Sequence, residues 1–275
     1  MSQNHIKLGI CNEIFKGWEI EEVFRFIAEL GYDGLEIAPY TLADSVLDIS
    51  SEERKAIVTS AAKFGVEVIG THWLLVTPPG LSLSTPDGAV RKKSSRYLSS
   101  LVEFTGDIGG SLMVLGSPKQ RSIGKDQDRD SVEQYMREVL EEPLSIAEER
   151  GVFICLEPLS RAETNFINTA EEACAFIARV SHPYLRLILD VKAMSDESLP
   201  IPEIFRNSRD YLLHVHANDK NLRGPGSGSV DFQPIISVLR EINYSGYLSV
   251  EVFDFEEGPE AIARNARNYL KQVYR

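Results

Sequence analysis

The sequence is poor in the features that mark a secreted or disulfide-bonded protein. Its 275 residues include three cysteines, Cys11, Cys155 and Cys174, an odd number with no C-x-x-C spacing. This usage argues against a disulfide framework and suits a reducing compartment. The first residues carry no basic stretch followed by an apolar run, so they do not resemble a signal peptide. We therefore expect a cytoplasmic protein.

A membrane-spanning run and a cluster of basic residues are also missing. The uncharged stretch 68–86 contains Pro78, Pro79, Gly80 and several Ser and Thr residues, which make it unfit to span a membrane. Lys and Arg number 29 against 41 Asp and Glu, so the net charge is −12. Proteins that bind nucleic acid through its phosphates usually present a basic face. We therefore expect neither a membrane nor a nucleic-acid partner; the acidic balance favours metal cations and neutral substrates.

What the sequence does contain is a regular alternation of short apolar runs and longer segments with helical periodicity. The runs predict strands at 6–14, 33–38, 66–73, 111–116, 152–157, 185–190, 211–216 and 247–252. The periodic segments predict helices at 19–30, 51–64, 91–106, 131–150, 169–180, 202–207, 232–241 and 259–273.

Eight strand–helix pairs in this order predict an α/β protein with a closed TIM (β/α)8 barrel. Alternation forces parallel pairing through right-handed crossovers. Units averaging about 34 residues match a closed barrel better than an open doubly wound sheet. No linker or low-complexity segment divides the chain, so we expect a single domain spanning 1–275.

The last four predicted strands each end in a residue that can bind a metal. These residues are Glu157, Asp190, His216 and Glu251, separated by 33, 26 and 35 residues. Because the chemistry of such barrels lies at the carboxyl ends of the strands, all four side chains can converge on the axis. An isolated glutamate at a strand end more often caps a helix, but converging carboxylates repel unless a cation or shared protons neutralise them. Four in succession favour a divalent-metal site.

The segments around these positions resemble a known family. They include LEPLSRAETNFINT (156–169), LILDVKAM (187–194), HVHANDKN (214–221), GSVDFQPIISVL (228–239) and GYLSVEVF (246–253). GLEIAPY (34–40), GTHWLL (70–75) and LGSPKQR (115–121) extend the resemblance through most of the chain. The sequence looks like the xylose isomerase-like TIM barrels. More narrowly, it is similar to the sugar phosphate isomerase/epimerase group, which includes ketose 3-epimerases of the tagatose/psicose type.

That resemblance implies one divalent ion per chain on the four strand-end residues, with Mn²⁺ expected and Mg²⁺, Co²⁺ or Zn²⁺ as alternatives. It also implies that Glu163 binds substrate and that Arg223 corresponds to a substrate-binding arginine, at a spacing one residue longer than usual. Ketose 3-epimerases carry a substrate-binding histidine where this chain has Ala193, so one contact with the sugar is absent or supplied differently. Lys220 is a further candidate, although a salt bridge with Asp219 is the favoured interpretation.

Histidines and aromatic residues supply the remaining candidates. His72 and Trp73, at the end of the third strand, face the expected mouth and could contact the sugar, with simple packing the alternative for His72. Trp18 and Phe166 could also stack on the apolar face of a sugar. His214 points the same way as His216 but one layer deeper, so we interpret it as a hydrogen-bonded core residue.

The chemistry implied is proton transfer on a keto-sugar. A metal that chelates a carbonyl oxygen and the adjacent hydroxyl acidifies the C–H between them, because the resulting enediolate is stabilised. As the resemblance implies, Glu157 and Glu251 are the candidate catalytic pair: one removes the proton and the other returns it. Asp190 and His216 would serve only as ligands. The sequence thus predicts a metal-dependent sugar isomerase or epimerase.

Other functions stay open at this point. The same chemistry can expel a β-substituent, as a dehydratase or lyase on a cyclitol or 3-keto-sugar would do. A sugar-binding barrel without catalysis is a third interpretation. An endonuclease IV-like repair enzyme is disfavoured, because Gly116 and Ala193 stand where further metal ligands would be expected. The resemblance also implies a homodimer or homotetramer.

Overall fold

The computed structural model describes residues 6–274, which form a closed barrel of eight parallel strands. The strands are β1 (Lys7–Cys11), β2 (Gly34–Ile37), β3 (Glu67–Thr71), β4 (Leu112–Leu115), β5 (Phe153–Leu156), β6 (Leu185–Asp190), β7 (Leu212–Ala217) and β8 (Tyr247–Val250). Each strand pairs with the next, and β1 also pairs with β8, where Gly9 lies opposite Ser249. The predicted TIM barrel is confirmed.

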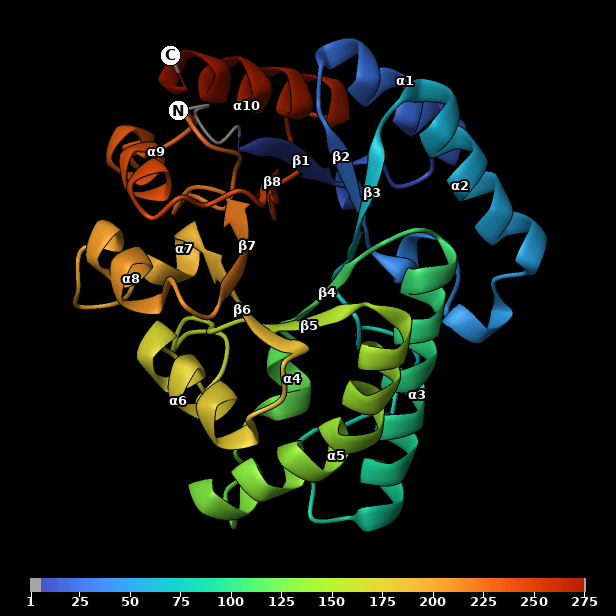
Figure 1. The fold of residues 1–275 in the computed structure, drawn as a ribbon, viewed down its shortest axis with the longest axis vertical. Coiled ribbons are helices and arrows are strands. Elements are labelled where there is room, and N and C mark those ends of the chain that lie inside the picture. The colour runs from blue at the N-terminus through green and yellow to red at the C-terminus, as the bar shows by residue number, and fades with distance from the viewer. Residues whose placement is uncertain (1–5, 275) are drawn as a thin grey trace.

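Helices connect successive strands and surround the barrel, as Figure 1 shows. The longer ones are α1 (Ile20–Leu30), α2 (Ser51–Phe64), α3 (Gly88–Asp107), α5 (Arg129–Arg150), α6 (Ala170–Val180), α8 (Ile201–Ser208), α9 (Phe232–Glu241) and α10 (Pro259–Val273). All eight predicted helices are present. Within residues 6–274, no helix combines the length and the apolar character needed to cross a bilayer.

Local sequence signals account for where these helices begin and end. Ser50 caps α2 reciprocally: its hydroxyl accepts from the Glu53 N–H, and the Glu53 carboxylate accepts from the Ser50 N–H at 2.8 Å. Helices α1 and α5 stop at Gly31 and Gly151, whose φ angles are +82° and +68°. Glycine adopts this left-handed conformation without a Cβ clash, which is why the chain turns there into the next strand.

Inward-facing side chains fill the barrel below the strand ends. They form a small buried group of Ile69, Leu112, Val114, Cys155 and Ile188. Gly34 makes room for this layer, because a Cβ at that position would lie 2.6 Å from Cγ1 of Ile69. A packed interior leaves the carboxyl ends of the strands as the place where the barrel can hold a ligand.

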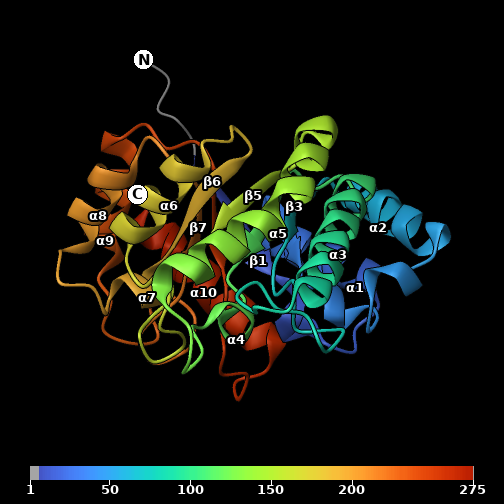
Figure 2. The same cartoon turned by 90° about the horizontal axis from the view of Figure 1, so that it is seen from below.

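Short helical elements at the strand ends were not predicted. The strand expected at 6–14 ends at Cys11, and the 3-10 turn η1 (Asn12–Phe15) follows it. Helices α4 (Pro118–Arg121) and α7 (Val191–Met194) follow β4 and β6, and the 3-10 turns η2 (Pro39–Thr41) and η3 (Val46–Asp48) follow β2. Four residues are too few for a helical period to emerge from a sequence. Figure 2 shows α4 and α7 toward the lower side of the barrel, at the end where the strands stop.

Candidate metal centre

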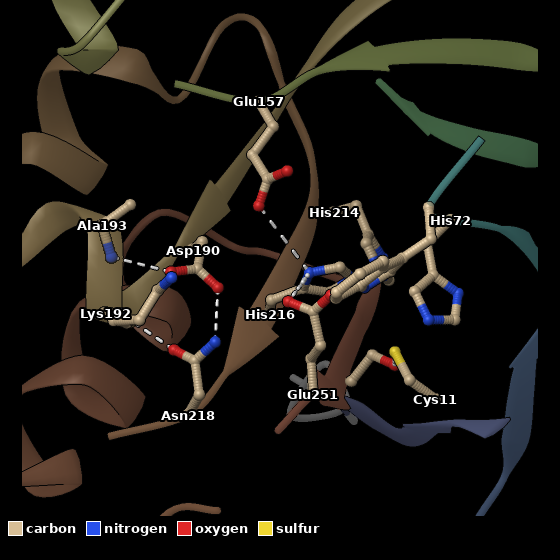
Figure 3. Close-up of polar contacts among 12 residues, drawn as sticks. Cys11, His72, Glu157, Asp190, Lys192, Ala193, His214, His216, Asn218 and Glu251 are labelled. Atoms are coloured by element: carbon tan, nitrogen blue, oxygen red, sulfur yellow. Dashed lines mark hydrogen bonds and ion pairs between the residues drawn. The ribbon is translucent and has the colours of Figure 1, made fainter. Parts of the chain in front are cut away.

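Three carboxyl groups and one imidazole meet at the carboxyl end of the barrel. The residues are Glu157, Asp190, His216 and Glu251, hereafter the four-residue cluster, and one ligand atom from each lies within 4.8 Å of all the others. Their side chains converge in Figure 3. All four residues are buried, with exposed fractions of 7%, 1%, 0% and 4% in chain order. The structure therefore brings together the four residues that the strand-end pattern picked out.

Strand register explains this convergence. Asp190 ends β6 and lies opposite His216 on β7, which in turn lies opposite Ser249 on β8, two residues before Glu251. Glu157 follows β5 directly, and its carboxylate occupies space that Gly116 leaves open. A Cβ at Gly116 would lie 2.3 Å from Oε2 of Glu157. A side chain at this position, including the extra metal ligand of a nuclease-type site, would collide with the carboxylate as it stands.

A buried glutamate on β2 orients the imidazole of the cluster. Nε2 of His216 donates to Oε1 of Glu36 at 3.0 Å, because a carboxylate can only accept. Nδ1 of His216 is thereby turned toward the cluster, where it lies 3.0 Å from Oε2 of Glu251. His214 donates to the other oxygen of Glu36 at 2.8 Å, so it is a hydrogen-bonded core residue as predicted. Sequence reasoning missed Glu36, although a glutamate inside a buried apolar strand needs such partners.

The carboxylate of Asp190 is held by two donors on the same side. The backbone N–H of Ala193 donates to its Oδ1 at 2.7 Å, and the side-chain amide of Asn218 donates to its Oδ2. Figure 3 shows Asn218 between Asp190 and the backbone of Lys192. These contacts leave little freedom in the orientation of the Asp190 carboxylate.

The cluster places three buried carboxyl groups beside a single imidazole, so its negative charges are not balanced. Burial and then the carboxylates of Glu251 and Asp190 raise the pKa of Glu157 to about 8. Burial and Glu251 also raise the pKa of Asp190. Burial disfavours the charged form of His216, but Glu251 and Glu36 outweigh it and hold its pKa well above the usual value. Burial likewise opposes ionisation of Glu251, yet His216 outweighs it and lowers that pKa.

These residues fit a divalent cation. Nε2 of His216 is engaged by Glu36, so its buried Nδ1 faces the carboxylates of the cluster and is the nitrogen available to a metal. Three carboxylates and one imidazole suit hard-to-borderline ions such as Mn²⁺, Mg²⁺, Co²⁺ or Zn²⁺. Two further groups of potential ligands, one with Cys11 and His72 and one with His214 and His216, both depend on Glu36. Because both oxygens of Glu36 already accept hydrogen bonds, we interpret these groups as support for the cluster.

A cavity of about 280 Å³ opens above the four-residue cluster. The cluster contributes Glu157 and Glu251 to its wall, while His72 and Trp73 line it from the end of β3. Nε1 of Trp73 donates to Oε1 of Glu251 at 2.9 Å. Nε2 of His72 is 2.8 Å from Oε2 of Glu13, a buried residue of η1. His72 is therefore a buried, hydrogen-bonded residue that also lines the cavity.

Residues 24–273 match the family described as "Xylose isomerase-like TIM barrel". The chain belongs to this family. Among its curated relatives, D-psicose 3-epimerase of Ruminiclostridium cellulolyticum is 31% identical and aligns with 86% of this chain and 80% of its own length. The 3-dehydro-D-guloside 4-epimerase of Escherichia coli K12 is 27% identical and aligns with 97% of this chain and 99% of its own length.

Solved structures of sugar epimerases superpose closely on the barrel. D-psicose 3-epimerase with D-tagatose, from Clostridium cellulolyticum H10, gives a TM-score of 0.85 at 25% identity, covering 98% of each chain. The apo form of 3-keto-D-glucoside 4-epimerase from E. coli gives a TM-score of 0.83 at 24% identity, covering 98% of this chain and 99% of that one. At this identity, the similarity to the E. coli structure shows a shared fold.

Two of the substrate-binding candidates lie away from the cavity of this xylose isomerase-like barrel. Arg223 pairs with Asp254, Glu256 and Glu257 and lines a separate hollow beside α10. Lys220 is exposed and lines another hollow near α8. The structure thus does not bring either side chain to the four-residue cluster.

The favoured Lys220–Asp219 salt bridge is also not formed. The Asp219 carboxylate instead accepts backbone N–H groups, from Lys220 itself and from Gly228, Ser229 and Val230 of the following loop. It therefore shapes the loop after β7 and does not pair with the lysine ammonium.

Two of the aromatic candidates pack elsewhere. Phe166 is only 1% exposed and belongs to the core, where the guanidinium of Arg129 lies over its ring. Trp18 packs against Phe15 and Phe26. Phe253, which follows β8 and was not singled out from the sequence, lines the cavity in their place. A loop's length predicts that it can cover a site but not which of its side chains turns inward.

Glu163, the remaining substrate-binding candidate, borders the cavity. Its carboxylate accepts from Ser160 at 2.9 Å and from Lys192 at 3.0 Å. The fully buried Arg121 lies behind the wall and donates to the backbone carbonyl of Glu157 at 2.6 Å and to that of Ile167. Arg121 therefore ties the end of β5 to the loop that carries Glu163.

Proposed function

We propose that this enzyme is a divalent-metal-dependent epimerase or isomerase that moves a proton at a carbon beside the carbonyl group of a sugar. The observation that carries the proposal is the buried convergence of Glu157, Asp190, His216 and Glu251 beneath a cavity. Family membership supports it, because the curated relatives described above are named as sugar epimerases. The chain is accordingly an enzyme of the isomerase and epimerase class.

The four-residue cluster would hold the ion, with Nδ1 of His216 and one oxygen from each carboxylate as donors. A bound divalent cation polarises a carbonyl oxygen and so acidifies the neighbouring C–H. We expect Mn²⁺ in this role, with Mg²⁺, Co²⁺ and Zn²⁺ as alternatives, because the oxygen-rich donor set accepts all of them.

Glu157 and Glu251 are the residues we propose for proton transfer. They directly follow β5 and β8, and both line the cavity. A carboxylate on one side of the sugar takes the proton from carbon, and a carboxyl on the other side returns one to the opposite face, which inverts the centre. Return to the neighbouring carbon instead interconverts an aldose and a ketose. Neither course changes the composition of the sugar.

The surroundings of the two residues suit these roles. The indole N–H of Trp73 and the imidazole of His216 stabilise the ionised form of Glu251. Burial, and then the nearby carboxylates of Glu251 and Asp190, raise the pKa of Glu157 and favour its protonated form. A pair of carboxyls whose environments drive their pKa values apart is typical of an acid facing a base.

Exchange with solvent deuterium tests the proposal. Metal-loaded protein is incubated in D2O with a panel of free ketohexoses and 3-keto-glucosides, and NMR follows deuterium at carbon and the appearance of an epimer. We expect both with at least one sugar, and a rate at least about 100-fold lower for Glu251→Gln. The exposed Glu22→Gln on α1 is the matched control.

Two results would contradict the proposal. Near-wild-type exchange by metal-containing Glu251→Gln would remove its assignment as a base. Loss of water or of the glycosyl substituent, seen as a change of mass, would show that the same site performs elimination.

Assembly belongs to the proposal as well. We propose that the whole chain works as one domain and that its copies associate as a homodimer or homotetramer. Sedimentation equilibrium checks this: a single species of twice or four times the 30.8 kDa chain is expected, and a monomer would contradict it.

A further inference from the structure

A charged pair lies in the cavity wall, and the family resemblance accounts for its glutamate but not for its lysine. Nζ of Lys192 is 3.0 Å from Oε1 of Glu163, and both residues line the cavity. Their side chains are 13% and 28% exposed, so the pair is largely enclosed. The ammonium also lies 4.1 Å from the ring centroid of Phe253, a third residue of the wall.

The backbone beneath Lys192 is fixed by the cluster itself. The N–H of Lys192 donates to Oδ1 of Asn218 at 2.8 Å, while the amide of Asn218 donates to Asp190. The next residue, Ala193, donates its N–H to Asp190 at 2.7 Å. Figure 3 shows these three contacts around Asp190. The base of the lysine side chain is thus held in a set position relative to the proposed metal ligand.

The ammonium of Lys192 keeps a donor for a ligand. An ammonium has three N–H groups. One donates to Glu163 and the Phe253 ring occupies a second side. Within residues 6–274 no other hydrogen bond to this ammonium is formed, and the residue borders the cavity. A partly enclosed ammonium with an unused donor is well placed to bind an oxygen atom.

The chain also lacks the donors that the family motif led us to expect. Ala193 has no polar side chain, and Arg223 is engaged with three carboxylates outside the cavity. Of the lysines in the cavity wall, Lys119 is exposed at the rim, which leaves Lys192 as the enclosed one. Lys192 is thus an enclosed donor in the cavity wall of a chain that lacks an imidazole at position 193.

We propose that Lys192 is a substrate-contacting, specificity-determining residue that donates a hydrogen bond to a sugar hydroxyl oxygen beside the reacting carbon. Glu163 accepts a hydrogen bond from the neighbouring hydroxyl, so Lys192 and Glu163 together bind two adjacent hydroxyl groups of an uncharged sugar. A phosphate or carboxylate at this point would meet the carboxylate of Glu163 and the acidic cluster, which disfavours it. This inference rests on the proposed function and names the substrate class of the same site.

The test compares Lys192→Met, Lys192→Arg and the exposed control Lys55→Met, all loaded with Mn²⁺. The probes are the free ketohexose with the fastest deuterium exchange, its monodeoxy analogues and its phosphate ester. We expect Lys192→Met to lower kcat/KM for the parent sugar by about 10- to 100-fold, the usual effect of losing a hydrogen bond to a charged group. One deoxy analogue should be discriminated by wild type and by Lys192→Arg, but not by Lys192→Met. Mn²⁺ content should stay at the wild-type value.

Each other outcome overturns the inference. Wild-type kinetics and wild-type deoxy discrimination in Lys192→Met would show that the lysine does not touch the sugar. Loss of Mn²⁺ from that variant would show that it only supports Asp190. A preference for the phosphate ester that is lost in Lys192→Met would show that the ammonium binds an anionic group and not a hydroxyl. If wild type neither exchanges deuterium with nor binds any sugar of the panel by calorimetry, the proposed function fails, and this inference fails with it.

Discussion

At the scale of single residues, the site depends on groups that touch neither metal nor sugar. Glu36 is the clearest case, because its two carboxylate oxygens hold His214 and His216 and so determine which nitrogen of His216 faces the cluster. Partners of this kind fix the tautomer and the ring orientation of a metal-binding histidine.

We predict that Glu36→Gln lowers the affinity for Mn²⁺ by about 10- to 100-fold. The amide can replace only one of the two acceptor contacts, so one imidazole loses its support. Competition with a chromophoric chelator measures the affinity, and Glu22→Gln on the outer face of α1 is the control. Equal affinities for Glu36→Gln and wild type would contradict the role of Glu36.

A second prediction concerns the stability of the metal-free protein against pH. The pKa of Glu157 rises from 4.5 to about 8 on folding, so the folded state keeps a proton that the unfolded state has released. Stability is therefore lost as pH rises from about 4.5 to about 8. Asp190 and His216, whose pKa values are also raised, act in the same direction. The pKa of Glu251 is lowered, so its contribution to the free energy of unfolding is lost only as pH falls below this range.

Thermal unfolding in the presence of a chelator, at several values of pH from 5 to about 8.5, checks this dependence. The melting temperature should fall across the range, and it should fall less in Glu157→Gln. A melting temperature that is constant, or that falls equally in wild type and variant, would show that Glu157 is not perturbed as described.

At the scale of elements, the turns that follow the strands build the cavity wall. Gly116, between β4 and α4, leaves room for the Glu157 carboxylate. We predict that Gly116→Ala lowers Mn²⁺ affinity by about tenfold or more, because the added methyl group must displace that carboxylate. Overpacking of this kind costs about 1–3 kcal/mol. Gly88→Ala in α3 is the matched control, since the nearest atom to its Cβ would be Nη2 of Arg91 at an ordinary contact distance of 3.7 Å. Unchanged affinity in Gly116→Ala would mean that the carboxylate does not need this space.

The same elements explain what the sequence could and could not predict. The eight strands and eight long helices follow from periodicity, and the four-residue cluster follows from its repeat along the strand ends. Lys192 and Arg121 were missed because they lie on α7 and α4, four-residue helices without a detectable period. Arg223 was assigned by motif spacing, but the acidic loop after β8 engages it elsewhere. A contact made by a long side chain on a loop depends on its neighbours in space, which spacing does not encode.

At the scale of the whole molecule, closure of the barrel by β1 and β8 turns four separate strand ends into one site. An ion bound by residues from β5, β6, β7 and β8 links four strands in the folded state only, so it should stabilise the entire barrel. At a free Mn²⁺ concentration 100 times the dissociation constant, the gain is about 2.7 kcal/mol. For a chain of this size that corresponds to a rise in melting temperature of roughly 5 °C. No rise in calorimetry at saturating Mn²⁺ would contradict the linkage.

The central claim is that these four residues hold one divalent ion, and metal analysis of the purified protein tests it most directly. Mass spectrometry is applied to wild type and to the Glu157→Gln/Glu251→Gln double variant, both purified without added metal. We expect about one Mn, Co, Mg or Zn per chain in wild type and none in the double variant, with both proteins folded. Absence of metal from wild type even after loading, or equal metal in both proteins, would contradict it.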